Sequence, residues 1–346
     1  MPRKNRRLIL LVGLLGTFFF SSDVFSAKRL PLLKEIQVQS SIDRSMQPAL
    51  MWLPKKARTQ KTPMLVFLHS WSGNYKQNNG TWQKEAVDRG WIYLHPHFRG
   101  ANKSPKACGS RLARQDILDA ISAISKRYKV DSTRIYLAGH SGGGHMAMLM
   151  AGYHPSRFSA VSSWCGISNL KNWYLYHAPR GREGKYAKMV SSCCGGKPGH
   201  SQKIDAQYKA RSPWQHLKNI GNLPFDLNAG VYDGQKGSVP FYQSLRAFNA
   251  VANAHGDKEK AISEEVLLEL WNTHTLNLPE ESDIAKDKEY ERAIILRRQT
   301  GKTRVTIFDG NHESLAHSAC NWLAKQQRQT KIETKKKTKT TRKRTP

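Results

Sequence analysis

A serine flanked by glycines, placed between an apolar strand and a helix of small residues, limits most strongly how this chain can fold. The apolar residues 135–138 lead directly into Gly-His-Ser-Gly-Gly at 139–143, and a helical pattern follows to residue 153. So tight a turn strains the serine backbone, and only small neighbours leave room for it. The pattern predicts a nucleophile elbow that presents the Ser141 hydroxyl at the edge of a sheet. The alternative is a glycine-rich turn that only packs a helix against a sheet.

Strands and helices alternate along the rest of the chain. This alternation is typical of a mostly parallel sheet with helices on both faces, and it predicts one α/β domain over residues 28–325, of the α/β-hydrolase fold. Two opening strands are expected within 35–54, and buried strands at 64–69, 91–97, 134–140, 158–164 and 225–232. Helices are expected at 81–88, 114–128, 143–153 and 239–254, followed by paired strands at 293–298 and 304–308 and a closing helix at 312–325.

Two insertions interrupt the alternation. The first, residues 166–222, has no regular pattern and is rich in aromatic residues, so we interpret it as an irregular lid. Its Trp173 and Tyr174 are candidate substrate-binding residues because aromatic faces stack on sugar and phenolic rings, although such residues also form the core of a lid. The second insertion, about 256–286, is charged and is expected to be helical around 264–271.

The N-terminus has the features of a secretory signal peptide. Four Lys or Arg residues precede the apolar residues 8–20, and small residues follow near position 27. An uncleaved anchor is less favoured, because a spanning helix needs about 20 apolar residues. We therefore expect residues 1–27 to be removed from a secreted or periplasmic protein, and the mature chain to have no transmembrane helix.

The five cysteines would mature where disulfides persist. An odd number leaves at least one thiol free or paired between chains. Cys193 and Cys194 are adjacent and cannot easily bond to each other, so one of them is expected to pair with Cys165 or Cys108; the sequence does not choose between these. The spacing matches no zinc pattern, and we expect neither a metal nor a cofactor.

Part of the net charge of +30 is concentrated at the C-terminus. Residues 326–346 are rich in Lys, Arg, Thr and Gln and almost free of apolar residues, so we expect a disordered tail. Such a tail either binds a polyanion or only keeps a basic protein soluble. None of the common nucleic-acid-binding motifs is present, and no specific nucleic-acid partner is expected.

Two later residues fit the partners that Ser141 needs. In this fold the catalytic acid precedes the histidine in the sequence, and each lies just after one of the last strands. Asp233 follows the predicted strand 225–232, and His312 comes shortly after 304–308. His312 would accept the Ser141 proton while Asp233 holds its tautomer. Asp226, Asp309 and Glu313 are alternative acids. For the oxyanion we expect the N–H groups of Gly142 and Trp71, the latter in the loop after the first buried strand.

With these residues the chain resembles serine hydrolases of the prolyl oligopeptidase (S9) family, which are also similar to acetylxylan and feruloyl esterases and to dienelactone hydrolase. The resemblance covers about 64–325 and rests on Gly-His-Ser-Gly-Gly-Gly-His at 139–145, Asp-Gly at 233–234 and Asp-Gly-Asn-His-Glu at 309–313. It implies that Ser141, Asp233 and His312 act through an acyl-enzyme.

Oligopeptidases of this family carry a β-propeller ahead of the catalytic domain, and the roughly forty residues between the predicted signal peptide and the first buried strand leave no room for one. We therefore expect an exported hydrolase of small-molecule or polysaccharide esters, for example acetyl or feruloyl substituents. The alternatives are a peptidase acting on small peptides, which would use the same catalytic residues, and a non-catalytic polyanion-binding protein on a hydrolase scaffold.

Overall fold

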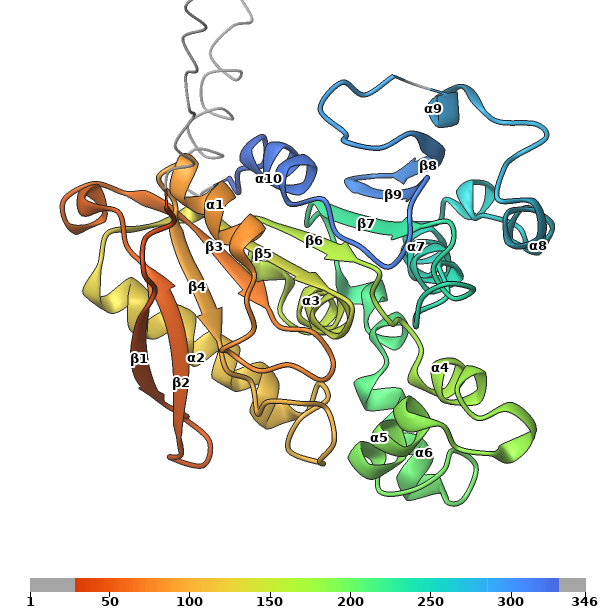
Figure 1. The fold of residues 1–346 in the computed structure, drawn as a ribbon, viewed down its shortest axis with the longest axis horizontal. Coiled ribbons are helices and arrows are strands. Elements are labelled where there is room, and N and C mark those ends of the chain that lie inside the picture. The colour runs from red at the N-terminus through yellow and green to blue at the C-terminus, as the bar shows by residue number, and fades with distance from the viewer. Residues whose placement is uncertain (1–28, 285, 330–346) are drawn as a thin grey trace, which may run out of the picture.

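A computed structural model describes residues 29–284 and 286–329. In these residues nine strands form one sheet in the order β1-β2-β4-β3-β5-β6-β7-β9-β8 (Figure 1). The pairs from β4 to β9 are parallel, and β1, β2 and β8 are joined antiparallel at the two edges. The strands are β1 Lys34–Gln39, β2 Met46–Trp52, β3 Thr62–Leu68, β4 Ile92–Pro96, β5 Val130–His140, β6 Ala160–Trp164, β7 Phe225–Gly230, β8 Ile294–Thr300 and β9 Thr303–Phe308. The predicted α/β-hydrolase sheet is confirmed.

Helices cover both faces of the sheet. On β3, Val66 packs into one hydrophobic core and its neighbour Phe67 into the other, because successive side chains of a strand point to opposite faces. The first core is covered by α2 (Arg111–Arg127), α3 (Gly142–Tyr153) and α7 (Tyr242–His255). The second is covered by α1 (Gly80–Asp88) and α10 (Ala316–Ala324). This two-sided burial explains why the central strands read as continuous apolar runs.

The lid is more regular than the sequence indicates. It contains α4 (Leu170–Tyr176), α5 (Lys185–Cys194) and α6 (Gln202–Arg211), which lie together beyond the end of the sheet (Figure 1). The prediction of an irregular segment was wrong because these helices are short and their apolar contacts lie mainly with one another, in a third hydrophobic core. The second insertion contains α8 (Glu264–Thr273), near the predicted helix, and α9 (Glu281–Ile284).

The C-terminal part differs from prediction in two places. The closing helix α10 begins at Ala316, so His312 lies in the loop before it and not within the helix. Residues 326–329, expected to begin a disordered tail, pack on the domain, and the Arg328 side chain donates to the carbonyl oxygens of Ser156 and Ser132. The predicted signal peptide and residues 330–346 of the tail lie outside the described residues. Among the described residues, no helix has the length and apolar character needed to cross a bilayer.

Candidate active site

Ser141 lies at the turn between β5 and α3 with φ 58° and ψ −119°, a backbone conformation that non-glycine residues rarely adopt. The turn is fixed by its neighbours, since the Ser141 N–H donates to the Trp164 oxygen on β6 at 2.8 Å. A Cβ added to Gly139 would stand 2.2 Å from the Gly143 oxygen, so the close approach of strand and helix excludes any side chain there. The elbow predicted from the glycine pattern is therefore present.

Trp71 lies against the elbow through its backbone. A Cβ added to Gly142 would stand 2.3 Å from both the nitrogen and the Cα of Trp71, which brings these two residues' backbones together beside Ser141. The Trp71 oxygen accepts from the Asn102 N–H at 2.8 Å, and its ring is buried with its centroid 4.6 Å from that of Trp173. The loop that contains Trp71 is thus held by a backbone hydrogen bond from Asn102 and by the packing of its ring on Trp173.

His312 and Asp233 form the acid–base pair that the sequence predicts. Nδ1 of His312 lies 2.7 Å from Oδ2 of Asp233, whose carboxylate is completely buried. The other carboxylate oxygen, Oδ1, accepts from the Val239 N–H at 3.1 Å. A Cβ on Gly237 would stand 2.2 Å from that oxygen, so the loop after β7 wraps closely around the carboxylate. Asp233 is therefore oriented from both of its oxygens.

Two of the alternative acids are engaged elsewhere. Asp226 forms an ion pair with Arg304, with 2.6 Å between Oδ1 and Nε. Glu313 forms one with Arg292, with 3.0 Å between Oε2 and a guanidinium nitrogen. Ser141, Asp233 and His312 follow β5, β7 and β9, whose carboxyl ends meet at one edge because these strands are parallel. Only the folded sheet selects Asp233 from the carboxylates that are close in sequence.

His140 and Cys165 lie beside His312, which the sequence analysis did not anticipate. The ring centroids of His140 and His312 are 4.7 Å apart, and the Cys165 thiol donates to the Glu313 oxygen at 3.3 Å. Burial, followed by the charge of His312, lowers the pKa of His140 to about 3. Burial, followed by the Asp233 carboxylate, raises the pKa of the Cys165 thiol. The available signal was that Cys165 follows β6 directly, as Ser141 follows the adjacent β5.

Among the described residues, one group could hold a metal. The ligand atoms of His140, Cys165 and His312 lie within 4.8 Å of one another. The His312 Nδ1 is already bonded to Asp233 and the raised pKa of Cys165 favours the neutral thiol, which is a poor metal ligand. His140 and Cys165 therefore serve as packing beside the pair formed by His312 and Asp233.

The two aromatic residues predicted to bind substrate form the core of the lid. Trp173 and Tyr174 are 1% and 4% exposed. The Trp173 indole N–H donates to the Ser238 oxygen at 2.8 Å, and the Tyr174 hydroxyl donates to Glu183 at 3.0 Å. Together with its contact with Trp71, the indole bond makes Trp173 a brace between the lid, the Trp71 loop and the loop after β7 that contains Asp233.

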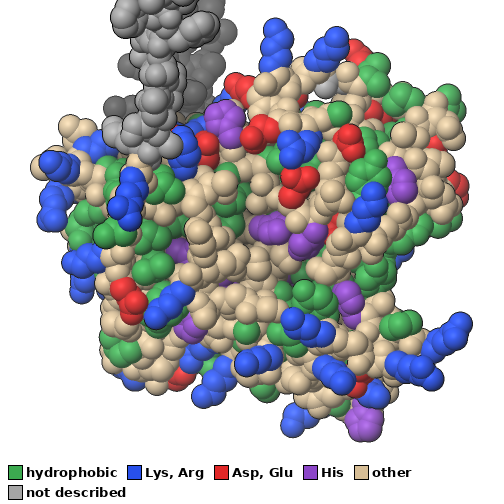
Figure 2. All heavy atoms as spheres, viewed as in Figure 1, with side chains coloured by type: hydrophobic (Ala, Val, Ile, Leu, Met, Phe, Trp, Pro, Cys, Tyr) green, Lys and Arg blue, Asp and Glu red, His purple; other side chains and the backbone are tan. Residues whose placement is uncertain are grey.

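The exposed surface of the lid is basic. Between residues 166 and 222 only Glu183 and Asp205 are acidic, and Figure 2 shows Lys and Arg side chains gathered over the lid. The exposed basic residues are Lys171, Arg180, Arg182, Lys185, Lys188, Lys197, Lys203, Lys209 and Lys218. This surface would attract anions in a salt-dependent manner.

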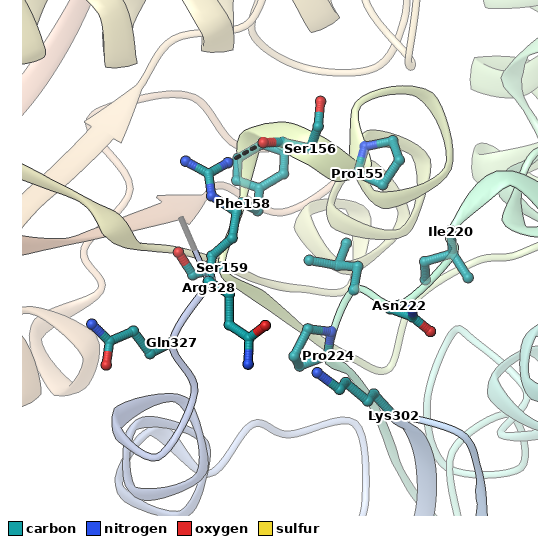
Figure 3. Close-up of a pocket in the computed structure, with 12 residues that line it drawn as sticks. Pro155, Ser156, Phe158, Ser159, Ile220, Asn222, Pro224, Lys302, Gln327 and Arg328 are labelled. Atoms are coloured by element: carbon teal, nitrogen blue, oxygen red, sulfur yellow. Dashed lines mark hydrogen bonds between the residues drawn. The ribbon is translucent and has the colours of Figure 1, made fainter. Parts of the chain in front are cut away.

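A cavity of about 410 Å³ lies at the opposite end of the sheet (Figure 3). It is lined by Ser159 before β6, Pro224 before β7 and Lys302 before β9, with Arg328 at its rim. These are the amino ends of the parallel strands. The cavity is therefore separate from Ser141, which follows the carboxyl end of β5.

Solved structures with a similar fold include the Pyrococcus horikoshii acylaminoacyl peptidase, at 21% identity and a TM-score of 0.54 over 65% of this chain. A Mycobacterium tuberculosis puromycin-hydrolysing peptidase matches at 19% identity and a TM-score of 0.53 over 64% of this chain. The matches span 36% and 34% of those two chains. A comparison with curated proteins gives no significant match.

The family model of the prolyl oligopeptidase family matches residues 78–265, which is more than half of the 346 residues. This segment contains Ser141 and Asp233 and runs from the loop before α1 into α8. The matched segment, the parallel sheet and the serine elbow lead to one assignment: the chain belongs to the prolyl oligopeptidase family of serine hydrolases.

Proposed function

We propose that the protein hydrolyses an acyl bond by forming an acyl-enzyme at Ser141. The observation that carries the proposal is the 2.7 Å bond between His312 Nδ1 and the buried Asp233, at the same sheet edge as the strained Ser141 turn. With Nδ1–H donated to Asp233, Nε2 is the atom left to accept the Ser141 proton. The imidazolium then returns that proton to the leaving group, and water repeats the cycle on the acyl-enzyme.

Groups around the site would stabilise the negative oxyanion and the positive His312 imidazolium that form during this reaction. The N–H groups of Gly142 and Trp71 are proposed to donate to the oxyanion. His140 remains neutral at physiological pH because its pKa is lowered to about 3, so it adds no positive charge beside the imidazolium that forms on His312. Asp233 supplies the compensating negative charge within a buried loop.

An amide bond is the proposed target. The similar structures are named as an acylaminoacyl peptidase and a puromycin-hydrolysing peptidase, and these names favour amide hydrolysis over the ester hydrolysis expected from the sequence. We therefore propose a peptidase acting on small aminoacyl or acyl-peptide substrates. The basic lid surface favours the approach of negatively charged substrates.

The test compares amide and ester turnover in the same purified protein. Aminoacyl p-nitroanilides with and without an N-acyl group are measured beside p-nitrophenyl acetate. We expect turnover of at least one anilide, abolished in Ser141→Ala and retained in Ser132→Ala, whose side chain is exposed. Ester turnover without any anilide turnover would overturn the peptidase proposal and return the ester hydrolase expected from the sequence.

A fluorophosphonate probe tests the mechanism separately from the substrate, because it reacts with an activated serine whatever the natural acyl group. Labelling at Ser141 in the folded protein is expected. Folded protein without label would favour the polyanion-binding alternative. Export and polyanion binding through the C-terminal tail remain proposals. N-terminal sequencing of secreted protein tests the first, and heparin retention after deletion of residues 330–346, which keeps the packed residues 326–329, tests the second.

A further inference from the structure

Trp214 presents its ring to solvent on a fixed part of the backbone. The residue is 41% exposed, whereas each of the other eight tryptophans is buried or half-buried. It lies in the short 3₁₀ helix Pro213–Gln215, which follows α6. Its N–H donates to the Ser168 oxygen at 3.1 Å, and the Ser168 hydroxyl donates to the Gln243 oxygen on α7 at 2.7 Å. A ligand that binds this ring therefore orders little of the chain.

Two cavities meet at Trp214. The larger, of about 560 Å³, lies between α4, α7 and α8, and the smaller, of about 420 Å³, lies between α4 and α6. Asn169, Trp214 and Gln215 line both of them, so the cavities form one groove beside the indole, which we call the Trp214 groove. No catalytic residue lines it, so it is a site apart from Ser141.

The lining of the Trp214 groove is mostly polar. Besides Trp214, only an alanine and a buried tyrosine among the lining residues are not strongly polar. The side-chain amides of Asn172, Gln215 and Asn253 make no hydrogen bond to another group in the described part of the chain. Such amides can both donate and accept. A flat aromatic face beside free amides matches a sugar ring, which has an apolar C–H face and hydroxyl groups around its edge.

The Trp214 groove also carries a positive charge. Lys218 lines the larger cavity and Lys171 and Lys209 line the smaller one, and none of these lysines forms an ion pair with a described residue. The two acidic side chains of the groove are already engaged, one with Arg246 and the other with a backbone N–H. The lysines are therefore free to attract negative groups on a ligand.

We propose that the Trp214 groove binds an acidic oligosaccharide, a chain of sugar rings that carry carboxylates. One ring stacks on the indole of Trp214, its hydroxyl groups bond to the free amides, and the carboxylates of neighbouring rings pair with the lysines. The groove thereby holds the protein on an acidic polysaccharide. Binding there changes no covalent bond and does not rest on the proposed peptidase activity at Ser141.

Titration of the full chain with a short oligogalacturonate, followed by calorimetry and tryptophan fluorescence at physiological ionic strength, tests the proposal. A malto-oligosaccharide of the same length has sugar rings without carboxylates. We expect oligogalacturonate to change the fluorescence and to bind about tenfold more tightly than the neutral sugar, since each of three exposed ion pairs adds a small gain. Equal affinities would overturn the acidic class of ligand, and no binding of oligogalacturonate would overturn the site.

Replacement of the aromatic ring separates stacking from attraction by charge. Trp214→Ala should weaken oligogalacturonate binding by about tenfold or more, and Trp214→Phe should recover most of the affinity because it keeps an aromatic face. Leu175→Ala is the matched control, since Leu175 is an exposed apolar residue of α4 outside the groove. Unchanged binding in folded Trp214→Ala would refute the site. Polyglutamate has carboxylates without sugar rings, so an equal loss of polyglutamate binding would refute sugar recognition.

A second pair of variants tests the charges. Lys209→Gln combined with Lys218→Gln should weaken oligogalacturonate binding severalfold and leave binding of the neutral sugar unchanged. The control combines Lys188→Gln with Lys203→Gln, two exposed lysines of the lid outside the groove, and equal losses in both double variants would overturn the role of the groove lysines. Ser141→Ala should bind oligogalacturonate as the wild type does, so a failure of the peptidase proposal leaves this test intact.

Discussion

Replacing Gly142 by alanine would place a methyl group against the backbone of Trp71. The added Cβ would lie 2.3 Å from the Trp71 nitrogen, whereas ordinary contact begins at 3.4 Å, so one of the two segments must move by about 1 Å. A displacement of this size at a catalytic group costs up to about 100-fold in rate, and loss of one oxyanion donor costs about 100- to 1,000-fold in kcat. We expect kcat of Gly142→Ala to fall within this range, equivalent to about 3–4 kcal/mol of transition-state stabilisation.

The assay is steady-state turnover of the best anilide or ester, with the folded fraction taken from circular dichroism and the Tm. KM should change little, because the proposed donors act on the transition state. Gly80→Ala is the matched control: its Cβ would meet its nearest neighbour at 3.4 Å in the first turn of α1, and full activity is expected. A folded Gly142→Ala protein with kcat within threefold of wild type would refute the proposed oxyanion site.

Three further perturbations follow from the structure. Asp233→Asn should lower kcat about 10⁴-fold without unfolding the protein, because an amide leaves His312 in the wrong tautomer; a loss of less than tenfold would contradict the role of Asp233. The Arg99 guanidinium pairs with the buried Asp116 and with the partly exposed Asp43, so Asp116→Asn removes one charged hydrogen-bond partner and should destabilise the fold by about 2 kcal/mol in urea unfolding; a change below about 0.5 kcal/mol would argue against it. Stability should also decline as pH falls below about 6.5, by roughly 2 kcal/mol per buried histidine at pH 5, since the unfolded state binds protons that the folded state excludes. Urea unfolding at pH 7 and pH 5 tests this, and equal stabilities would refute it. The histidines concerned are His69 and His140, with pKa values lowered to about 3, and His95 and His145, with values lowered to about 4, in each case mainly by burial.

The sequence was informative wherever a short window carries its own physical constraint. The apolar run before Ser141 and the glycines around it define a strand, a turn and a helix without reference to distant residues, because the constraint is local crowding of the backbone. The parallel order of the sheet followed from alternating patterns of the same kind. The positions of Asp233 and His312 followed from their places after late strands.

The lid shows where such patterns fail. Its helices have only 7 to 10 residues and are separated by turns, so no run of the segment is long enough for a helical pattern to stand out, and the segment reads as irregular. Aromatic composition alone also suggested that Trp173 and Tyr174 face a substrate. Their burial depends on how α4 packs on α5, on α6 and on the Trp71 loop, which no short stretch of sequence encodes.

By itself, the sequence determined the elbow and the class of sheet, since each depends on neighbours within a few positions. Only the tertiary structure decided which carboxylate serves His312, since Arg304 engages Asp226 and Arg292 engages Glu313. It also decided that His140 and Cys165 surround His312. These outcomes depend on residues far apart in the chain, which meet only when the parallel strands bring their carboxyl ends to one edge.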